Sequence, residues 1–240
     1  MLTSINPANN KIIKQYDEMT ASDSSEIILF AHQSFLEWKE TSFVHRAELM
    51  KNAAKVLRQN SEEYSALMTM EMGKPIAQSR AEVEKCAWVC DYYAENAEKF
   101  LTDELIKTEA TKSFVTYQPL GAILAVMPWN FPFWQVFRFA APNLMAGNSG
   151  VLKHASNVSG CALAIEEVFR KAGFPENLFR TLLVSSKNVK AIIEDEKIQA
   201  VTLTGSVPAG RSVASIAGNS IKKTVMELGG SDPYVILEDA

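Results

Sequence analysis

The feature that most constrains the fold is a series of short apolar runs in the second half of the chain, each followed by a helix-like pattern. Helical patterns lie at about 131–146, 158–172, 187–194 and 207–218. Runs that are apolar at successive positions suit strands covered on both faces. The alternating order predicts right-handed βαβ units and an open parallel sheet, an α/β Rossmann-like fold. The runs are SFVTYQ, GAILAVM, SGVLKH, FRTLLV, AVTLTG, KKTVMEL and PYVILE.

The first part of the chain has a different hydrophobic pattern. Apolar residues in AELMKNAAKVLRQNSEEYSALMTMEMG recur near a 3.6-residue period, which predicts a helix that ends at Gly73. The stretch PIAQSRAEVEKCAWVCDYYAENAEKFL predicts a second long helix with its charges on a solvated face. We therefore expect one 240-residue unit: a helical part at about 1–110, a candidate bridging strand at about 111–120 and the βαβ sheet at about 121–240.

Composition excludes several classes of partner. The 24 basic and 28 acidic residues give a net charge of −4 without a long run of either sign, so we expect no nucleic-acid partner. No apolar stretch reaches the roughly 20 residues that cross a bilayer, and the amino terminus lacks a signal-peptide core. We expect no membrane partner and a cytoplasmic location.

The cysteines and histidines do not predict a metal site. Cys86 and Cys90 are four residues apart, a spacing that two metal ligands can have, but no second pair accompanies them. We interpret both as packing residues, and Cys161 likewise, because it lies in an amphipathic pattern. The odd count fits a reducing compartment. The three histidines are isolated from one another.

Parallel sheets bind ligands beyond the carboxyl ends of their strands, so the strand exits are where chemistry is expected. At the first exit, Asn130 stands between Pro128 and Pro132. Its amide can donate a hydrogen bond to a developing oxyanion or cap the next helix, and the residues alone leave both open. At the next exit, Lys153 can meet ribose hydroxyls or a phosphate, or simply be a surface lysine.

Two further exits carry candidates. Thr204, Gly205 and Ser206 precede a helix whose amino-terminal N–H groups can hold a pyrophosphate, although the GxGxxG fingerprint is missing. Glu227, beside Gly229 and Gly230, is either a general base or an ordinary solvated glutamate.

Taken in order and spacing, PWNFP, the Lys153 stretch, TLTGS and MELGG resemble the amino-terminal half of the aldehyde dehydrogenases. INPANN and EMGKPIAQSRAEVEKC extend the likeness over essentially the whole chain. The resemblance implies an aldehyde substrate, an NAD(P) cofactor and a homo-oligomeric parent enzyme. It implies that Asn130 donates to the oxyanion and that Glu227 is the general base. The cofactor site it implies comprises Trp129, Asn130, Lys153, His154, Ala155, Ser156, Gly205, Ser206 and Leu228.

Two positions refine the resemblance. Arg138 stands where succinate-semialdehyde dehydrogenases carry an arginine for the substrate carboxylate; the alternative is a surface arginine. Ser156 stands where NAD-selective members usually have a glutamate that repels the extra phosphate of NADP, so use of NADP or of both cofactors is implied. KHAS and ELGGSDPYVILEDA look closest to the shorter bacterial succinate-semialdehyde dehydrogenases, although Phe139 replaces the more usual lysine.

The nucleophile is the piece that the resemblance does not supply. The family's nucleophilic cysteine lies a few dozen residues beyond the position of Glu227, and none of the three cysteines matches its motif. We therefore expect a truncated dehydrogenase sequence that is inactive alone. A free-standing NAD(P)-binding module and an inactive subunit of a larger assembly are the alternatives.

Overall fold

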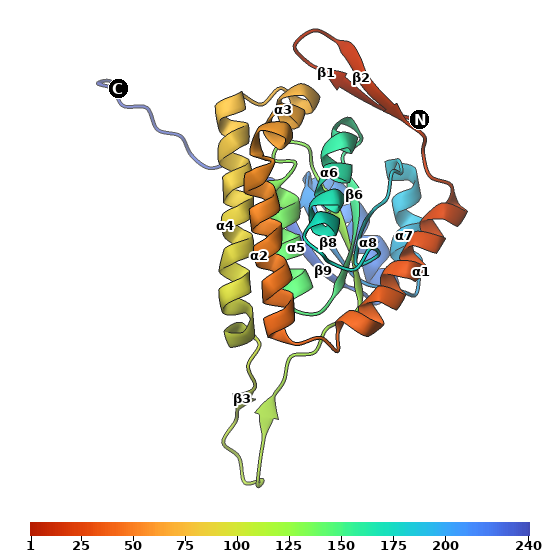
Figure 1. Ribbon diagram of the computed structural model, residues 1–240, viewed down its shortest axis with the longest axis vertical. Coiled ribbons are helices and arrows are strands. Elements are labelled where there is room, and N and C mark those ends of the chain that lie inside the picture. The colour runs from red at the N-terminus through yellow and green to blue at the C-terminus, as the bar shows by residue number, and fades with distance from the viewer.

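A computed structural model describes residues 1–240, and its centre is a five-stranded parallel sheet (Figure 1). The strand order is β7-β6-β5-β8-β9, and every neighbouring pair is parallel. This confirms the predicted α/β class and its βαβ order. The strands are β5 (Ala122–Met127), β6 (Ser149–His154), β7 (Phe179–Thr181), β8 (Ile198–Gly205) and β9 (Lys223–Leu228).

Helices cover both faces of the sheet and create two separate cores. The first core joins β5–β7 to the crossover helices α5 and α6 and to the outer helices α2–α4. The second joins β5, β6 and β8 to α1, α7 and α8 on the opposite face. Ala125 and Met127 point into the first core and Leu124 into the second, which is why the run is continuously apolar. The helices are α1 (Ala21–Trp38), α2 (Phe43–Gln59), α3 (Ser61–Met72), α4 (Ile76–Phe100), α5 (Trp134–Met145), α6 (Ser159–Lys171), α7 (Val189–Glu194) and α8 (Val207–Asn219).

The long helix predicted to end at Gly73 is in fact two helices, α2 and α3. They meet at Asn60, whose side-chain amide donates to Val56 O at 2.8 Å and whose backbone leaves the helical region. Asparagine offers the backbone such local alternatives, and the apolar period runs on through the break. The predicted stop at Gly73 is confirmed, because this residue ends α3 in the left-handed conformation at φ 75°.

The first 16 residues correct the expectation of a purely helical amino-terminal part. They form an antiparallel hairpin of β1 (Leu2–Asn6) and β2 (Lys11–Tyr16). Asn6 accepts a hydrogen bond from Ala8 N in the turn, and Asn10 takes a positive φ of 57°. The hairpin lies against α3, α6 and the short 3₁₀ helix Ser156–Val158 rather than in the main sheet.

Three predicted strands differ in extent or partner. SFVTYQ contributes only β4 (Phe114–Val115), which pairs with β3 (Glu104–Leu105) in a separate ribbon that protrudes from the body (Figure 1). FRTLLV is a strand over Phe179–Thr181 alone. PYVILE forms no strand: it is exposed and has no partner strand beyond β9. Residues with high β-propensity form a strand only when a neighbouring strand packs beside them, so the prediction of a strand at PYVILE is wrong.

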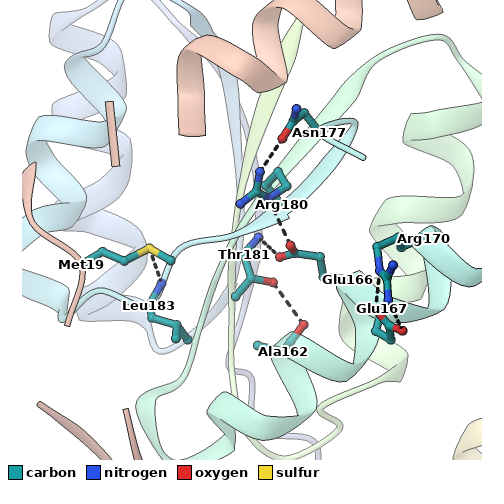
Figure 2. A network of polar contacts seen from close by, with 9 residues as sticks. All are labelled: Met19, Ala162, Glu166, Glu167, Arg170, Asn177, Arg180, Thr181 and Leu183. Atoms are coloured by element: carbon teal, nitrogen blue, oxygen red, sulfur yellow. Dashed lines mark hydrogen bonds and ion pairs between the residues drawn. The ribbon is translucent and has the colours of Figure 1, made fainter. Parts of the chain in front are cut away.

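The edge strand β7 is held by side chains of α6 (Figure 2). Glu166 accepts hydrogen bonds from Thr181 N at 2.6 Å and Arg180 Nε at 3.1 Å. Thr181 Oγ1 donates to Ala162 O at 3.1 Å. These bonds supply partners that β7, with a neighbour on one side only, does not find within the sheet.

None of the helices combines the length and the apolar character needed to span a membrane. The three cysteines are free and fully buried, which confirms their interpretation as packing residues, and burial raises the pKa of each thiol. No group of three or more histidine, cysteine, aspartate or glutamate side chains is arranged to hold a metal ion.

Candidate active site

The strand exits meet along one edge of the sheet, as the βαβ order predicts. In register, Met127 of β5 pairs with His154 of β6, and Gly205 of β8 pairs with Leu228 of β9. The loops that follow these strands therefore start at nearly the same level.

A cavity of about 520 Å³ opens at this edge. It brings together six of the residues singled out in the sequence, from three different strand exits. Asn130 and Glu227 both line it, so the two proposed catalytic side chains face a common space. The lining residues are Pro128, Trp129, Asn130, Thr204, Gly205, Ser206, Glu227, Leu228 and Gly229.

A buried ion pair supports the loop after β5. Glu82 of α4 accepts hydrogen bonds from Phe133 N and Trp134 N, both at 2.9 Å, and so caps the start of α5. Lys74 pairs with the same carboxylate, and its ammonium lies 3.7 Å from the centre of the Phe131 ring. Both charged side chains are almost fully buried. The sequence pattern had assigned Glu82 to a solvated face, which is wrong.

The end of β6 presents a cation without a protein partner. Lys153 is 8% exposed, and its ammonium makes no hydrogen bond or ion pair with another residue. Burial lowers the pKa of Lys153, and the Glu18 carboxylate partly opposes this shift. An almost buried ammonium group of this kind is suited to a ligand oxygen. Ala155 and Ser156 follow it, half-buried, outside the 520 Å³ cavity.

His154 differs from the other cofactor candidates in the partners of its side chain, although Lys153, Ala155 and Ser156 also lie outside the cavity. Its side chain is buried, and it does not line the cavity. Both ring nitrogens meet backbone groups instead.

The loop after β8 leads into the only long crossover helix without a buried carboxylate at its start. Glu82 caps α5, and Glu71 caps α6 by accepting from Gly160 N at 2.9 Å and Cys161 N at 2.8 Å. At α8 only the exposed Ser206 hydroxyl accepts, from Ala209 N at 3.4 Å. Because the amino-terminal end of a helix favours negative charge, the start of α8, which has no carboxylate cap, is suited to bind an anion.

A close approach places that helix against β9. A Cβ at Gly210 would lie 2.4 Å from Leu228 Cδ2. Glycine leaves room for the Leu228 side chain against α8, and Ser206 and Leu228 line the same cavity.

Glu227 also faces a second cavity, of about 410 Å³, between α5 and the uncovered face of β8 and β9. There it forms an ion pair with Arg138 of α5. Arg138 also donates to Gln135 Oε1 at 2.8 Å and to Thr204 Oγ1 at 3.3 Å. The arginine is therefore neither an unpaired charge nor a plain surface residue. Sequence reasoning missed Gln135 and Lys223 in this wall, because neither lies at a strand exit.

Known proteins are similar to this chain over its whole length. A probable succinate-semialdehyde dehydrogenase, NADP(+) type, from Synechocystis sp. is 54% identical over the whole chain, and a succinate-semialdehyde dehydrogenase, NADP(+) type, from Mycobacterium bovis is 50% identical. The crystal structure of succinic semialdehyde dehydrogenase from Streptococcus pyogenes in complex with NADP+ superposes with a TM-score of 0.95 at 36% identity, over 99% of this chain and 52% of that one.

The chain spans about half the length of the curated relatives it matches, 53% for both. The model of the aldehyde dehydrogenase family matches residues 1–240. The chain therefore belongs to the aldehyde dehydrogenase family.

Proposed function

We propose that these residues are the cofactor-binding half of an NAD(P)-dependent aldehyde dehydrogenase that oxidises succinate semialdehyde. The observation that carries the proposal is the meeting of Asn130 and Glu227 in one cavity beside the open start of α8. Two relatives, 54% and 50% identical to the chain, are named for the same substrate and for NADP+.

The residues present fit a dinucleotide. The unpartnered ammonium of Lys153 suits ribose or phosphate oxygens, and the open start of α8 at Ser206 suits the pyrophosphate. Ser156 is uncharged, so it does not repel a ribose phosphate. When bound, the nicotinamide supplies the acceptor for the hydride that leaves the aldehyde carbon.

Each site residue then has a chemical role. The Asn130 amide donates to the oxygen of the aldehyde as negative charge develops there, an interaction that is worth about 3–4 kcal/mol in other enzymes. Glu227 accepts the proton of the nucleophile or of the hydrolytic water. Arg138 binds the distal carboxylate of the substrate. The substrate carboxylate then replaces Glu227 as the partner of Arg138, so Glu227 is released to act as the base.

The nucleophile has to come from outside these residues. All three cysteines are fully buried, and none lines either cavity. Since a covalent adduct needs an accessible thiolate, we infer that the thiol belongs to the part of the enzyme that the relatives have beyond this half.

The 240-residue chain alone is therefore expected to bind NADP+ without oxidising succinate semialdehyde. Fusion to the remaining half of the Synechocystis relative should give NADPH formation, measured by absorbance, and Glu227→Gln in the fusion should abolish it. An inactive fusion that is folded and binds NADP+ would favour a free-standing binding module or an inactive subunit instead. Oxidation by the chain alone would contradict the inferred source of the nucleophile.

Lys153→Met is expected to weaken NADP+ binding by about ten- to a hundredfold, because a charge-assisted hydrogen bond to the ligand is lost. Titration calorimetry on the 240-residue chain measures the effect. Lys187→Met is the matched control, since this lysine is exposed and belongs to the neighbouring loop after β7. Equal affinity for the wild type and the Lys153 variant would remove Lys153 from the cofactor site.

A further inference from the structure

His154, the last residue of β6, stands between two strand exits. The side chain is 5% exposed. Its Nε2 lies 2.8 Å from Pro132 O in the loop after β5. Its Nδ1 lies 2.9 Å from Ala155 N in the loop after β6. One ring thus touches the backbone of both loops.

The contacts define one tautomer. Ala155 N–H can only donate, so Nδ1 carries the lone pair and the proton sits on Nε2, which donates to Pro132 O. Nδ1 also lies 3.3 Å from Met127 O. Two acceptors cannot form a hydrogen bond with each other, so we assign the tautomer from the shorter contact between Nδ1 and Ala155 N. The neutral ring therefore satisfies one donor and one acceptor of the main chain.

The loop from Pro128 to Phe133 depends on such outside partners. Its two prolines have no N–H, and Pro132 O has no backbone donor. The N–H of the same peptide group, that of Phe133, donates to Glu82. His154 and Glu82 thus bind the C=O and the N–H of one peptide group, that between Pro132 and Phe133, while Trp129 and Asn130 remain exposed at the cavity.

We propose that His154 is a positioning residue: it fixes the Pro128–Phe133 loop to the exit of β6 and so sets where Trp129 and Asn130 face the cofactor cavity. The role replaces a direct contact between His154 and the cofactor. What Asn130 does at that place rests on the proposed function; the coupling between the two loops does not.

Two substitutions separate positioning from plain core packing. In His154→Gln the amide nitrogen can reach the place of Nε2 and donate to Pro132 O. His154→Leu fills similar space without a donor. Ile165→Ala, at a fully buried site of α6 outside both loops, controls for general loss of stability.

The experiment measures hydrogen exchange by mass spectrometry and NADP+ affinity in the complete 240-residue chain. His154→Leu should raise exchange in the peptide that holds Trp129, Asn130 and Phe131, with little change in the other strands, and weaken NADP+ binding about tenfold. His154→Gln should stay close to the wild type in both readouts. Ile165→Ala should leave the loop peptide and the affinity unchanged.

The proposal is overturned if His154→Leu leaves the loop peptide at wild-type exchange, if it raises exchange equally throughout the sheet, or if His154→Gln is as impaired as His154→Leu. Should the wild-type chain fail to bind NADP+, the proposed function fails at its cofactor step. The exchange readout then still decides the role of His154.

Discussion

Glu82→Ala is expected to lower the free energy of unfolding by about 3–5 kcal/mol, the usual cost of breaking a buried ion pair from one side. The substitution leaves the Lys74 ammonium buried without its carboxylate, and it removes the acceptor of Phe133 N and Trp134 N. Such a loss is a large fraction of the roughly 5–15 kcal/mol that stabilises a typical domain. Urea unfolding followed by circular dichroism measures it.

A matched control uses an exposed ion pair between α3 and α4. Glu62 and Arg80 are 73% and 50% exposed, so Glu62→Ala should leave the unfolding midpoint close to that of the wild type. The double variant Lys74→Met, Glu82→Gln removes both charges and keeps an acceptor for the two N–H groups. It should be more stable than Glu82→Ala. Equal destabilisation by Glu62→Ala and Glu82→Ala would show that burial of the pair is energetically unimportant.

The position of the candidate site could be predicted because topology places it. A parallel βαβ order brings the loops after β5, β8 and β9 to one edge, whatever packs around them. The sequence therefore brought Asn130, Ser206 and Glu227 together correctly, and the cavity that they line confirms this convergence. Their chemical roles stay predictions.

The support of the site could not be predicted in the same way. Glu82 is 51 residues from Phe133 in the sequence, and only the packing of α4 on α5 makes it a buried cap. In the pattern of α4 it is one charge among several. His154 was grouped with Lys153 by adjacency, but successive residues of a strand point to opposite faces. Both side chains are buried, and the groups that each one meets follow from the tertiary packing around the sheet.

As the pH falls, protonation of His154 should destabilise the folded chain before the carboxylates are protonated. Burial lowers the pKa of His154 from 6.5 to about 4, against the hydrogen bond to Pro132 O that raises it; the Lys153 charge lowers it further. Because the folded-state pKa is lowered, the unfolded chain binds the proton first. The stabilisation is complete above about pH 6.5 and is lost as the pH falls toward 4, in total about 3 kcal/mol.

Urea unfolding between about pH 6.5 and 4.5 isolates this contribution, with a slope of about 1.4 kcal/mol per pH unit for one proton. The carboxylates whose pKa values are lowered by hydrogen bonds, among them Glu18, Asp23 and Glu167, stay ionised in the folded chain and begin to bind protons in the unfolded chain only near the lower end of that window, since their ordinary values are 4.5 or 3.8. His154→Gln, which cannot titrate, should flatten the slope. An unchanged slope in that variant would mean that His154 is charged in the folded chain, and then Nδ1 could not accept from Ala155 N.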